Sequence, residues 1–434
     1  MTDNTTELDF GTTAQKATDA EKLPVVLLAL DQGRYDMARS LDELRALADA
    51  NGMDAVAEVV QKRATPEAAT LLGEGKVAEA RLVCQNVNAA AAIFDGELTG
   101  SQIRNLSAAL QVEVLDRTML ILEIFRARAT TNEGKLQTEL ATLRYQLPRL
   151  QGLGEALSRQ GGGGGGGGGA RRGAGETKLE LDRRHLHHRI EHLEGRLKEL
   201  EKRRGETRRA RRKNNVPVVA LVGYTNVGKS SLLNALCGEQ IFEADMLFAT
   251  LDPTSRALDL PDGRRVMLID TVGLVSRLPH QLVQAFHSTL EEAADADLVL
   301  NVCDVSSPEF DQQLEVTTGL LKELGAENVP VLTVLNKCDK LPELPLTLDR
   351  KTAAISAKTG MGLEKLLEKV ALNLPQTHQH LHLLIPYDKS GLIGEIRQTG
   401  KVYTEEYRED GTYLDANVEL KLCHRVQEYI LLNE

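Results

Sequence analysis

The stretch VPVVALVGYTNVGKSSLLNAL, residues 216–236, decides the fold of the central part of the chain. Its first residues are apolar and predict a buried strand, and its last residues have the spacing of a helix. Between them lies a glycine-bounded loop that ends in Gly228-Lys229-Ser230. Because glycine lets the backbone curl closely, successive N–H groups and the helix N-terminus can point at a polyphosphate. Strand, loop and helix together predict a phosphate-binding loop.

The residue types in this loop have expected roles. Lys229 should reach the β- and γ-phosphates and act in catalysis, and the Ser230 hydroxyl should ligate Mg²⁺. A side-chain oxygen at Asn226 raises a further hypothesis, a monovalent cation held near the phosphates, as in potassium-activated GTPases with asparagine at this position. Mg²⁺ is thus the predicted cofactor and K⁺ a second candidate. The predicted nucleotide-binding residues are Gly223, Tyr224, Thr225, Asn226, Val227, Gly228, Lys229, Ser230 and Ser231.

A second apolar strand ends in the sequence DTVG. The stretch VMLIDTVG, residues 266–273, closes with Asp270, Thr271, Val272 and Gly273, all four predicted to lie at the nucleotide. Asp270 would hold Mg²⁺ through water. The Gly273 N–H would sense the γ-phosphate and contribute to catalysis.

Two later loops predict that the base is guanine. In VLTVLNKCD, residues 331–339, the Asp339 carboxylate can accept from both N1–H and the 2-amino group, which adenine does not offer in that arrangement. Asn336 would brace the loops, and the Lys337 stem would cover the base. GTP and GDP are therefore the predicted ligands. Backbone N–H groups for guanine O6 are expected from Ser356, Ala357 and Lys358 of the stretch ISAKTG.

The first switch is expected within LFATLDPTSR, residues 247–256. Thr250 is the preferred second protein ligand of Mg²⁺ beside Ser230, and Thr254 is its rival. After Gly273, where a glutamine would orient the attacking water, the chain has Leu274. Since leucine can neither donate nor accept a hydrogen bond, we expect slow intrinsic hydrolysis that a partner accelerates. The predicted nucleotide contacts of this switch are Phe248, Ala249, Thr250, Leu251 and Asp252.

The N-terminal part alternates short apolar runs with amphipathic stretches. Such alternation predicts βαβ units and a parallel sheet. Ser40 is the expected N-cap of the first helix. The stretch GEGK, residues 73–76, lacks a preceding strand and a following Ser or Thr, so a nucleotide site there is disfavoured. Strands are expected at 25–30, 55–60, 90–96 and 112–116, and helices at 40–52, 76–87 and 98–111.

Leucines then recur at spacings of three and four residues on both sides of a run of nine glycines. This heptad spacing predicts an antiparallel helical hairpin with its glycine-rich tip at 151–176. Between Arg183 and Lys213 there are thirteen Lys and Arg residues against five Glu, a candidate RNA-contacting face. A solvated helix face and a disordered tip are the plainer readings. The seam residues are Leu136, Leu140, Leu143, Leu147, Leu150, Leu179, Leu186, Ile190, Leu193, Leu197 and Leu200, and the candidate RNA contacts are Arg171, Arg172, Arg183 and Arg184.

Two groups of histidines are candidate metal ligands. His188 and His192 have the i,i+4 spacing of a zinc pair, but no third ligand is placed nearby. His378, His380 and His382 alternate along a strand-like stretch. A solvent- or RNA-facing surface is the favoured interpretation of both groups.

Composition fits a multi-domain globular protein. The 434 residues are 42% hydrophobic, with a formal charge of −11. No apolar leader or membrane span is found, and five scattered cysteines without a CxxC pattern indicate a reducing compartment, so a cytoplasmic location is expected. The expected division is a disordered tail at 1–20, a parallel α/β domain at 21–126, the helical hairpin at 127–213, a nucleotide-binding α/β domain at 214–374 and a small α+β domain at 375–434.

These motifs, taken in order, resemble the HflX family of GTPases, related to translation factors. The resemblance covers nearly everything after residue 20 and includes Leu274. The tip reads Gly173-Ala174-Gly175-Glu176 where the family is closer to GPGE, and the glycine run is longer than is usual. The motifs that carry the resemblance are ATLLGEGKVAE, VLDRTMLILEIF, EGKLQTELATLRYQLPRL, GAGETKLELDRR, GYTNVGKSSLLNAL, LFATLDPTSR and DTVGL.

The resemblance implies a protein that binds the large ribosomal subunit. Its N-terminal domain and hairpin would contact ribosomal RNA near the peptidyl-transferase centre, and GTP-dependent switching would dissociate or rescue ribosomes under stress. Two alternatives stay open: an RNA-binding or RNA-remodelling module with incidental nucleotide turnover, and a GTPase with a non-ribosomal partner. A monomer is expected, since the leucine seam is satisfied within one hairpin.

Overall fold

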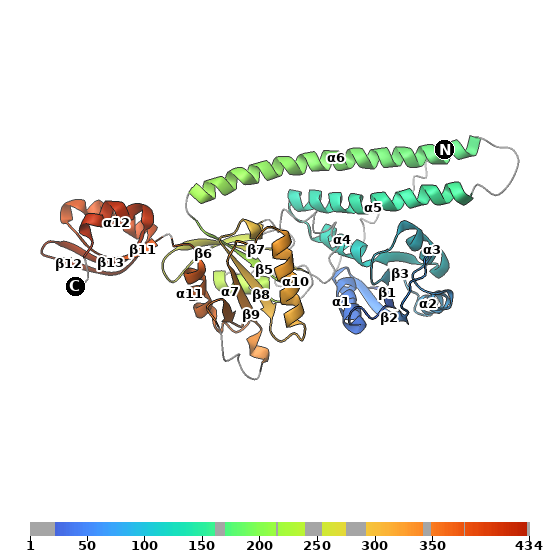
Figure 1. Cartoon of the computed structure of the whole chain (residues 1–434), viewed down its shortest axis with the longest axis horizontal. Helices are drawn as coiled ribbons and strands as arrows, with labels where there is room; N and C mark the ends of the chain where they lie inside the picture. Colours follow the sequence, from blue (N-terminus) through green and yellow to red (C-terminus); the bar gives the residue numbers. More distant parts are fainter. Residues whose placement is uncertain are drawn as a thin grey trace. The chain divides into compact units, whose positions relative to one another are not determined.

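The computed structural model describes residues 22–160, 170–213, 216–238, 254–274, 292–341, 349–376 and 378–431. The described residues form two compact units that divide within one long helix, after Leu200. The predicted fold class is confirmed: parallel α/β sheets, a helical hairpin and a small antiparallel sheet follow one another along the chain (Figure 1).

The N-terminal unit begins with a parallel sheet in the order β2-β1-β3-β4. The central strand β1 is apolar over most of its length and buried on both faces, as expected for a parallel sheet covered by helices. The strands are β1 (Leu23–Asp31), β2 (Met53–Lys62), β3 (Ala91–Phe94) and β4 (Glu113–Asp116), and the helices α1 (Met37–Ala50), α2 (Glu74–Asn86), α3 (Gly100–Leu110) and α4 (Arg117–Arg128).

One helix start differs from expectation. Helix α1 begins at Met37 and is capped by Asp36, whose carboxylate accepts from the N–H groups of Ala38 and Arg39. Ser40, the expected cap, is buried one turn later and donates to Asp95 Oδ2 at 2.5 Å. The Asp36 carboxylate precedes the first turn and accepts from two backbone N–H groups that have no partner within the helix, so Ser40 is not needed as the cap and makes this tertiary contact instead.

Helices α5 (Asn132–Gln160) and α6 (Ala170–Lys213) form the hairpin, and up to Leu200 they lie side by side (Figure 1). Their seam buries Leu136, Leu140, Ile190 and Leu193, with Leu143, Leu147, Leu197 and Leu200 packed around it. Ion pairs of 2.7 Å, Arg144–Glu194 and Arg189–Glu139, flank the seam. The heptad prediction is confirmed for these positions.

The tip departs from the sequence expectation. The sequence predicts an irregular tip at 151–176, yet residues 151–160 belong to α5 and residues 170–176 to α6. Arg171 and Arg172 therefore lie in the first turn of α6. Residues 161–169 lie outside the described part of the chain. Each flank directly extends a long helix, and propagating an existing helix is far easier than nucleating one, so the two helices continue to the glycines.

The next unit contains a six-stranded sheet in the order β10-β9-β8-β5-β7-β6, parallel except for β6. Because β5 lies in its interior, the loop after β5 is flanked by the ends of β7 and β8. The elements are β5 (Val218–Val222), α7 (Lys229–Cys237), β6 (Thr254–Asp259), β7 (Arg265–Asp270), β8 (Leu298–Asp304), α10 (Phe310–Glu323), β9 (Val331–Asn336), η1 (Cys338–Lys340), β10 (Thr352–Ala354) and α11 (Leu363–Asn373).

The last part is an antiparallel sheet in the order β11-β13-β12. One face packs on helices around Leu383, Ile385, Ile396 and Leu414, and the other carries polar and aromatic side chains. Helix α12 lies between β11 and β12 in the chain. The elements are β11 (His378–Ile385), η2 (Tyr387–Lys389), α12 (Ser390–Thr399), β12 (Lys401–Arg408), β13 (Gly411–Glu419), α13 (Leu420–Val426) and η3 (Gln427–Tyr429).

Candidate nucleotide site

The loop between β5 and α7 is tightly packed at its two glycines. Gly223 has φ +154° and Gly228 has φ +90°, both of which favour glycine. A Cβ at Gly223 would lie 2.2 Å from Val302 O, and one at Gly228 would lie 2.5 Å from Asn336 Nδ2. Asn226, between them, is also left-handed at φ +60° and is exposed. The backbone therefore follows the curled path that a phosphate-binding loop needs.

Lys229 lies under this loop. Its Nζ donates to Gly223 O at 2.9 Å and to Tyr224 O at 2.8 Å. Burial lowers the pKa of the ammonium to about 8, and the nearby Asp270 carboxylate opposes this shift. A bound phosphate would supply the negative charge that the buried ammonium needs.

Ser230 and Asp270 meet at the carboxyl end of β7. The Ser230 hydroxyl donates to Asp270 Oδ2 at 3.0 Å, and Asp270 is only 1% exposed. Next to it, Thr271 donates to Leu221 O at 2.6 Å and ties β7 to β5. A hydroxyl and a carboxylate side by side are the hard oxygen ligands that Mg²⁺ prefers, so these residues fit the predicted cofactor.

The segment after β7 is hydrogen-bonded to the phosphate loop. Leu274 N donates to Gly223 O at 3.1 Å, and Thr225 N donates to Leu274 O at 2.7 Å. The Leu274 side chain is buried, at 2% exposed. Gly273 lies so close to the loop that a Cβ there would be 2.6 Å from Thr225 Cγ2 and 3.2 Å from Lys229 Nζ. The backbone N–H expected to sense the γ-phosphate therefore lies beside the lysine expected to bind it.

Asn336 bridges two of the predicted loops. Its Nδ2 donates to Val227 O at 2.8 Å, and its Oδ1 accepts from Ala357 N at 2.9 Å. With the side chain 2% exposed, these bonds are shielded from water. The expected bracing role of Asn336 thus has a direct geometric basis.

The Asp339 carboxylate is exposed and oriented by Ser356. The Ser356 hydroxyl donates to Asp339 Oδ1 at 2.6 Å, and this bond holds the pKa of Asp339 below its usual value. The sequence assigned Ser356 a backbone role toward guanine O6. Its side chain in addition positions the Asp339 carboxylate, which is predicted to read the base.

One contact was missed from the sequence. Lys337 Nζ donates to Asn226 O at 2.6 Å and pairs with Asp304 Oδ2 at 2.8 Å. Asp304 ends β8, more than thirty residues before Lys337, and Asn226 lies 111 residues before Lys337. A carboxylate at the end of an apolar strand, as at Asp270, was the available signal.

Some of the remaining predicted site residues lie in the described part of the chain and others do not. Residues 248–252, including Thr250, lie outside the described part of the chain. The rival Thr254 begins β6 and pairs in register with Asp270. Tyr224, Val227 and Val272 lie in the loops described above, as does Lys358 after β10, whereas Ser231 lies in the first turn of α7.

The predicted RNA contacts lie on α6. Arg183 and Arg184 are exposed, as are His185, His187, His188 and His192. His188 Nδ1 lies 3.6 Å from Glu191 Oε2. In the described part of the chain, His188 and His192 belong to no group of three potential metal ligands. The favoured solvent-facing interpretation therefore agrees with their exposure.

Comparison with known proteins decides the family. GTPase HflX of Caldanaerobacter subterraneus subsp. tengcongensis is 45% identical over 411 residues, which covers 95% of this chain and 94% of that protein. This chain belongs to the HflX family of GTPases. GTPase HflX of Escherichia coli (strain K12) is 39% identical, covering 86% of this chain and 88% of that protein. The crystal structure of SsGBP with GDP is 25% identical with a TM-score of 0.47, covering 81% of this chain and 98% of that one.

Three family models match successive parts of this HflX-family chain. They are described as GTP-binding GTPase N-terminal, over residues 38–126, GTP-binding GTPase Middle Region, over 128–212, and 50S ribosome-binding GTPase, over 218–337. The chain binds guanine nucleotides and hydrolyses GTP to GDP and phosphate. Among the described helices, none is both long and apolar enough to cross a bilayer.

Proposed function

We propose that this GTPase binds the large ribosomal subunit in its GTP-bound state and dissociates or rescues ribosomes under stress. The proposal depends on one observation above all: a long, exposed basic helix lies in the same chain as the nucleotide site. The family model described as 50S ribosome-binding GTPase, matched over residues 218–337, supports the same partner. Such a partner would place the protein in the cytoplasm.

The helical hairpin of α5 and α6, here called the arm, has the charge expected for contact with RNA phosphates. Helix α6 carries thirteen Lys and Arg residues against five Glu between Arg183 and Lys213, within a chain of net charge −11. Arg183 and Arg184 are both exposed on this helix. Exposed arginines bind phosphate bidentately and release counterions, so binding should weaken steeply with salt. Arg171 and Arg172, nearest the glycines, are proposed to contact RNA in the same way.

The chain connects the arm directly to the switch. Helix α6 ends at Lys213, and β5, which leads into the phosphate loop, begins at Val218. The short connection offers a route by which a rearrangement of the nucleotide loops can reorient the arm. Since the leucine seam is satisfied between α5 and α6, no second copy is needed to cover it, and we propose a monomer.

Side chains of this protein would bind the nucleotide and Mg²⁺ and hold them in position. Lys229 would hold the β- and γ-phosphates, and Asp339 would accept from the guanine edge. Ser230 and Thr250 would ligate Mg²⁺, with Asp270 acting through water. The Mg²⁺ ion would neutralise charge that develops on the phosphates.

Leu274 is the reason why we expect GTP hydrolysis to need a partner. Its side chain is apolar and buried, so it can neither orient nor polarise an attacking water. The ribosome is proposed to complete the site and to accelerate turnover.

Co-sedimentation with purified large subunits tests the proposal. We expect binding with a non-hydrolysable GTP analogue, little with GDP, and loss of binding in Arg183→Glu/Arg184→Glu. Arg265→Glu, an exposed arginine on β7, is the matched control and should bind normally. Binding that is indifferent to the nucleotide would indicate an RNA-remodelling module, and no binding in either state would indicate a non-ribosomal partner. Either result would overturn the proposal.

A further inference from the structure

The open face of the C-terminal sheet carries a cluster that the GTPase cycle does not use. Along β11, Leu381 and Leu383 point into the helix-covered core, so His380 and His382 lie on the opposite face. Asp415 lies on this same face of the neighbouring strand β13, between the buried Leu414 and Ala416. Two imidazoles and one carboxylate thus share one surface.

Strand register brings the three groups together. His382 pairs directly with Asp415 across the antiparallel ladder, and His380 is two residues away on the same face. His380 Nε2 lies 2.5 Å from Asp415 Oδ1, and His382 Nδ1 lies 3.9 Å from the same oxygen. One ligand atom from each residue lies within 4.8 Å of the others. The spacing of His380 and His382 alone favoured a solvent-facing surface; the carboxylate from a distant strand changes that interpretation.

Neighbouring aromatic rings restrict both imidazoles. The Tyr413 ring is stacked with His382 at 6.2 Å between centroids and 12° between planes. Its hydroxyl lies 3.0 Å from His382 Nδ1. Tyr403 meets His380 edge-on, at 5.5 Å and 86°. Rings held in this way lose less entropy when they bind an ion, which favours a preorganised site.

The charge of Asp415 is available to a cation. Within the described part of the chain its ion pairs are both with these imidazoles, and no lysine or arginine pairs with it. The side chains of His380, His382 and Asp415 are 55%, 31% and 24% exposed, so solvent can reach the cluster. A water molecule could therefore complete a four-coordinate ion.

We propose that His380, His382 and Asp415 bind a divalent transition-metal ion, with Zn²⁺ the best fit. Imidazole nitrogen suits Zn²⁺, whereas Mg²⁺ and Ca²⁺ prefer an all-oxygen set. Three protein ligands and a water are a common tetrahedral zinc set. None of these three residues is among the predicted Mg²⁺ ligands, Ser230 and Thr250.

Small side-chain rotations satisfy zinc geometry. Bonds of about 2.0–2.2 Å at tetrahedral angles separate ligand atoms by about 3.4 Å. The 2.5 Å contact between His380 and Asp415 opens, and the 3.9 Å contact between His382 and Asp415 closes. The Tyr413 hydroxyl yields its place at His382 Nδ1 to the ion. The bound ion would then link β11 to β13 across the face.

The test uses the untagged full-length protein, loaded with GDP and excess Mg²⁺ so that divalent ions do not enter the nucleotide site. Calorimetric titration with Zn²⁺ should show one ion per chain, and Co²⁺ should give the visible absorption of a tetrahedral site. Asp415→Asn and His382→Ala should each weaken Zn²⁺ binding at least about tenfold. His378→Ala is the matched control, since the His378 Nε2 contacts Thr399 O at 2.7 Å and is not in the cluster; this variant should bind as the wild type does.

A second variant separates this site from the histidines of α6. His188→Ala/His192→Ala should leave Zn²⁺ binding unchanged. If this double variant loses binding while Asp415→Asn keeps it, or if the wild type binds no Zn²⁺, the proposal is wrong. Unchanged GDP affinity and circular dichroism in Asp415→Asn would show that a loss of binding is not a loss of fold.

Discussion

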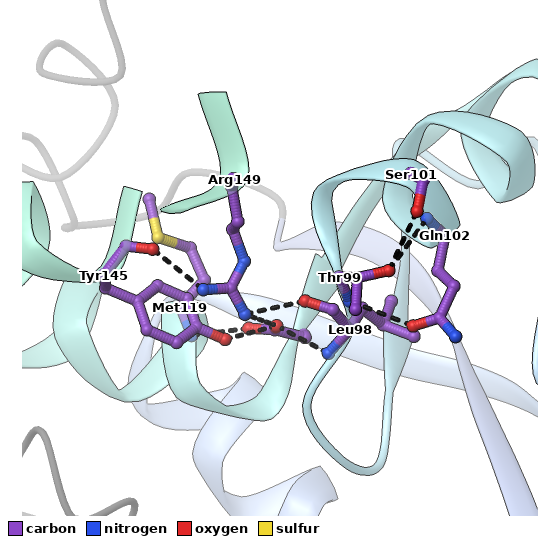
Figure 2. Close-up of polar contacts among 8 residues, drawn as sticks. Leu98, Thr99, Ser101, Gln102, Met119, Tyr145 and Arg149 are labelled. Carbon is purple, nitrogen blue, oxygen red and sulfur yellow. Dashed lines mark hydrogen bonds and ion pairs between the residues drawn. The ribbon is translucent and has the colours of Figure 1, made fainter. Parts of the chain in front are cut away.

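The Tyr145 phenol on helix α5 donates a hydrogen bond to the buried carboxylate of Asp116 at the end of β4. The same carboxylate accepts from Leu98 N at 3.0 Å, Met119 N at 2.9 Å and Arg149 at 3.0 Å. Arg149 also donates to Leu98 O at 2.7 Å and to Tyr145 O at 2.8 Å, as Figure 2 shows. One fully satisfied carboxylate therefore joins the hairpin to the end of the N-terminal sheet.

Tyr145→Phe should loosen this junction. Burial beside Asp116 raises the pKa of the phenol, which therefore stays a donor at every usable pH. Removing the hydroxyl takes one hydrogen-bond donor from a buried carboxylate, which should lower the local stability by about 1.5–3 kcal/mol. We expect amide hydrogen exchange in α4 and the first half of α5 to become about 10- to 150-fold faster. Tyr387→Phe, which removes an exposed bond of 2.7 Å to Arg408 O, is the control and should leave α4 and α5 unchanged.

Asp339→Asn should change the preferred base. Replacing the acceptor carboxylate by an amide leaves the N1–H and 2-amino donors of guanine without a partner, which costs binding. Xanthine carries an oxygen in place of the 2-amino group and can accept from the new amide. We expect GDP affinity to fall at least about 100-fold while XDP affinity rises, measured by displacement of a fluorescent nucleotide. Asp349→Asn, an exposed aspartate before β10, is the matched control. Unchanged base preference in Asp339→Asn would contradict the guanine assignment.

Ser356→Ala should raise the pH at which GDP affinity is lost on acidification. The hydrogen bond from Ser356 lowers the pKa of Asp339, so the carboxylate stays ionised and able to accept from guanine to a lower pH. Without that bond the pKa of Asp339 rises, and binding is lost earlier as the pH falls. GDP affinity measured from pH 7 downward should therefore drop at a higher pH in the variant than in the wild type. Superimposable profiles would show that Ser356 does not tune the carboxylate.

Potassium should accelerate hydrolysis if Asn226 helps to hold a monovalent ion. The residue is exposed in the phosphate loop at φ +60°, and its carbonyl is already held by Lys337, which leaves the side chain to face a ligand. We expect a higher turnover in K⁺ than in Na⁺ at equal ionic strength, and Asn226→Ala should abolish the difference. Equal wild-type rates in the two salts would contradict the hypothesis.

Local patterns account for what the sequence predicted. Strand β5, Gly223, Gly228 and helix α7 follow one another within twenty residues, so spacing alone defines the phosphate loop. The heptad seam is equally local, because each helix carries its own stripe. These features need no knowledge of the fold to be recognised.

Contacts between distant segments could not be predicted in this way. Tyr145 and Asp116 are 29 residues apart, His380 and Asp415 are 35 apart, and Ser40 and Asp95 are 55 apart. Each pair depends on how strands and helices register against one another. Spacing misassigned Ser40 for the same reason, since a serine near a helix start can cap the helix or enter a tertiary contact.

The intrinsic turnover of GTP should be slow, well below one per second, because Leu274 cannot orient water. Purified large subunits should raise this turnover at least about tenfold. A partner that completes the catalytic site of a GTPase can raise kcat by several orders of magnitude. Single-turnover phosphate release, with and without subunits, measures both rates. Leu274→Met keeps the apolar volume and should change neither, whereas Lys229→Ala should abolish hydrolysis in both conditions. Turnover of several per second by the free wild-type protein would show that the chain already carries a complete catalytic site.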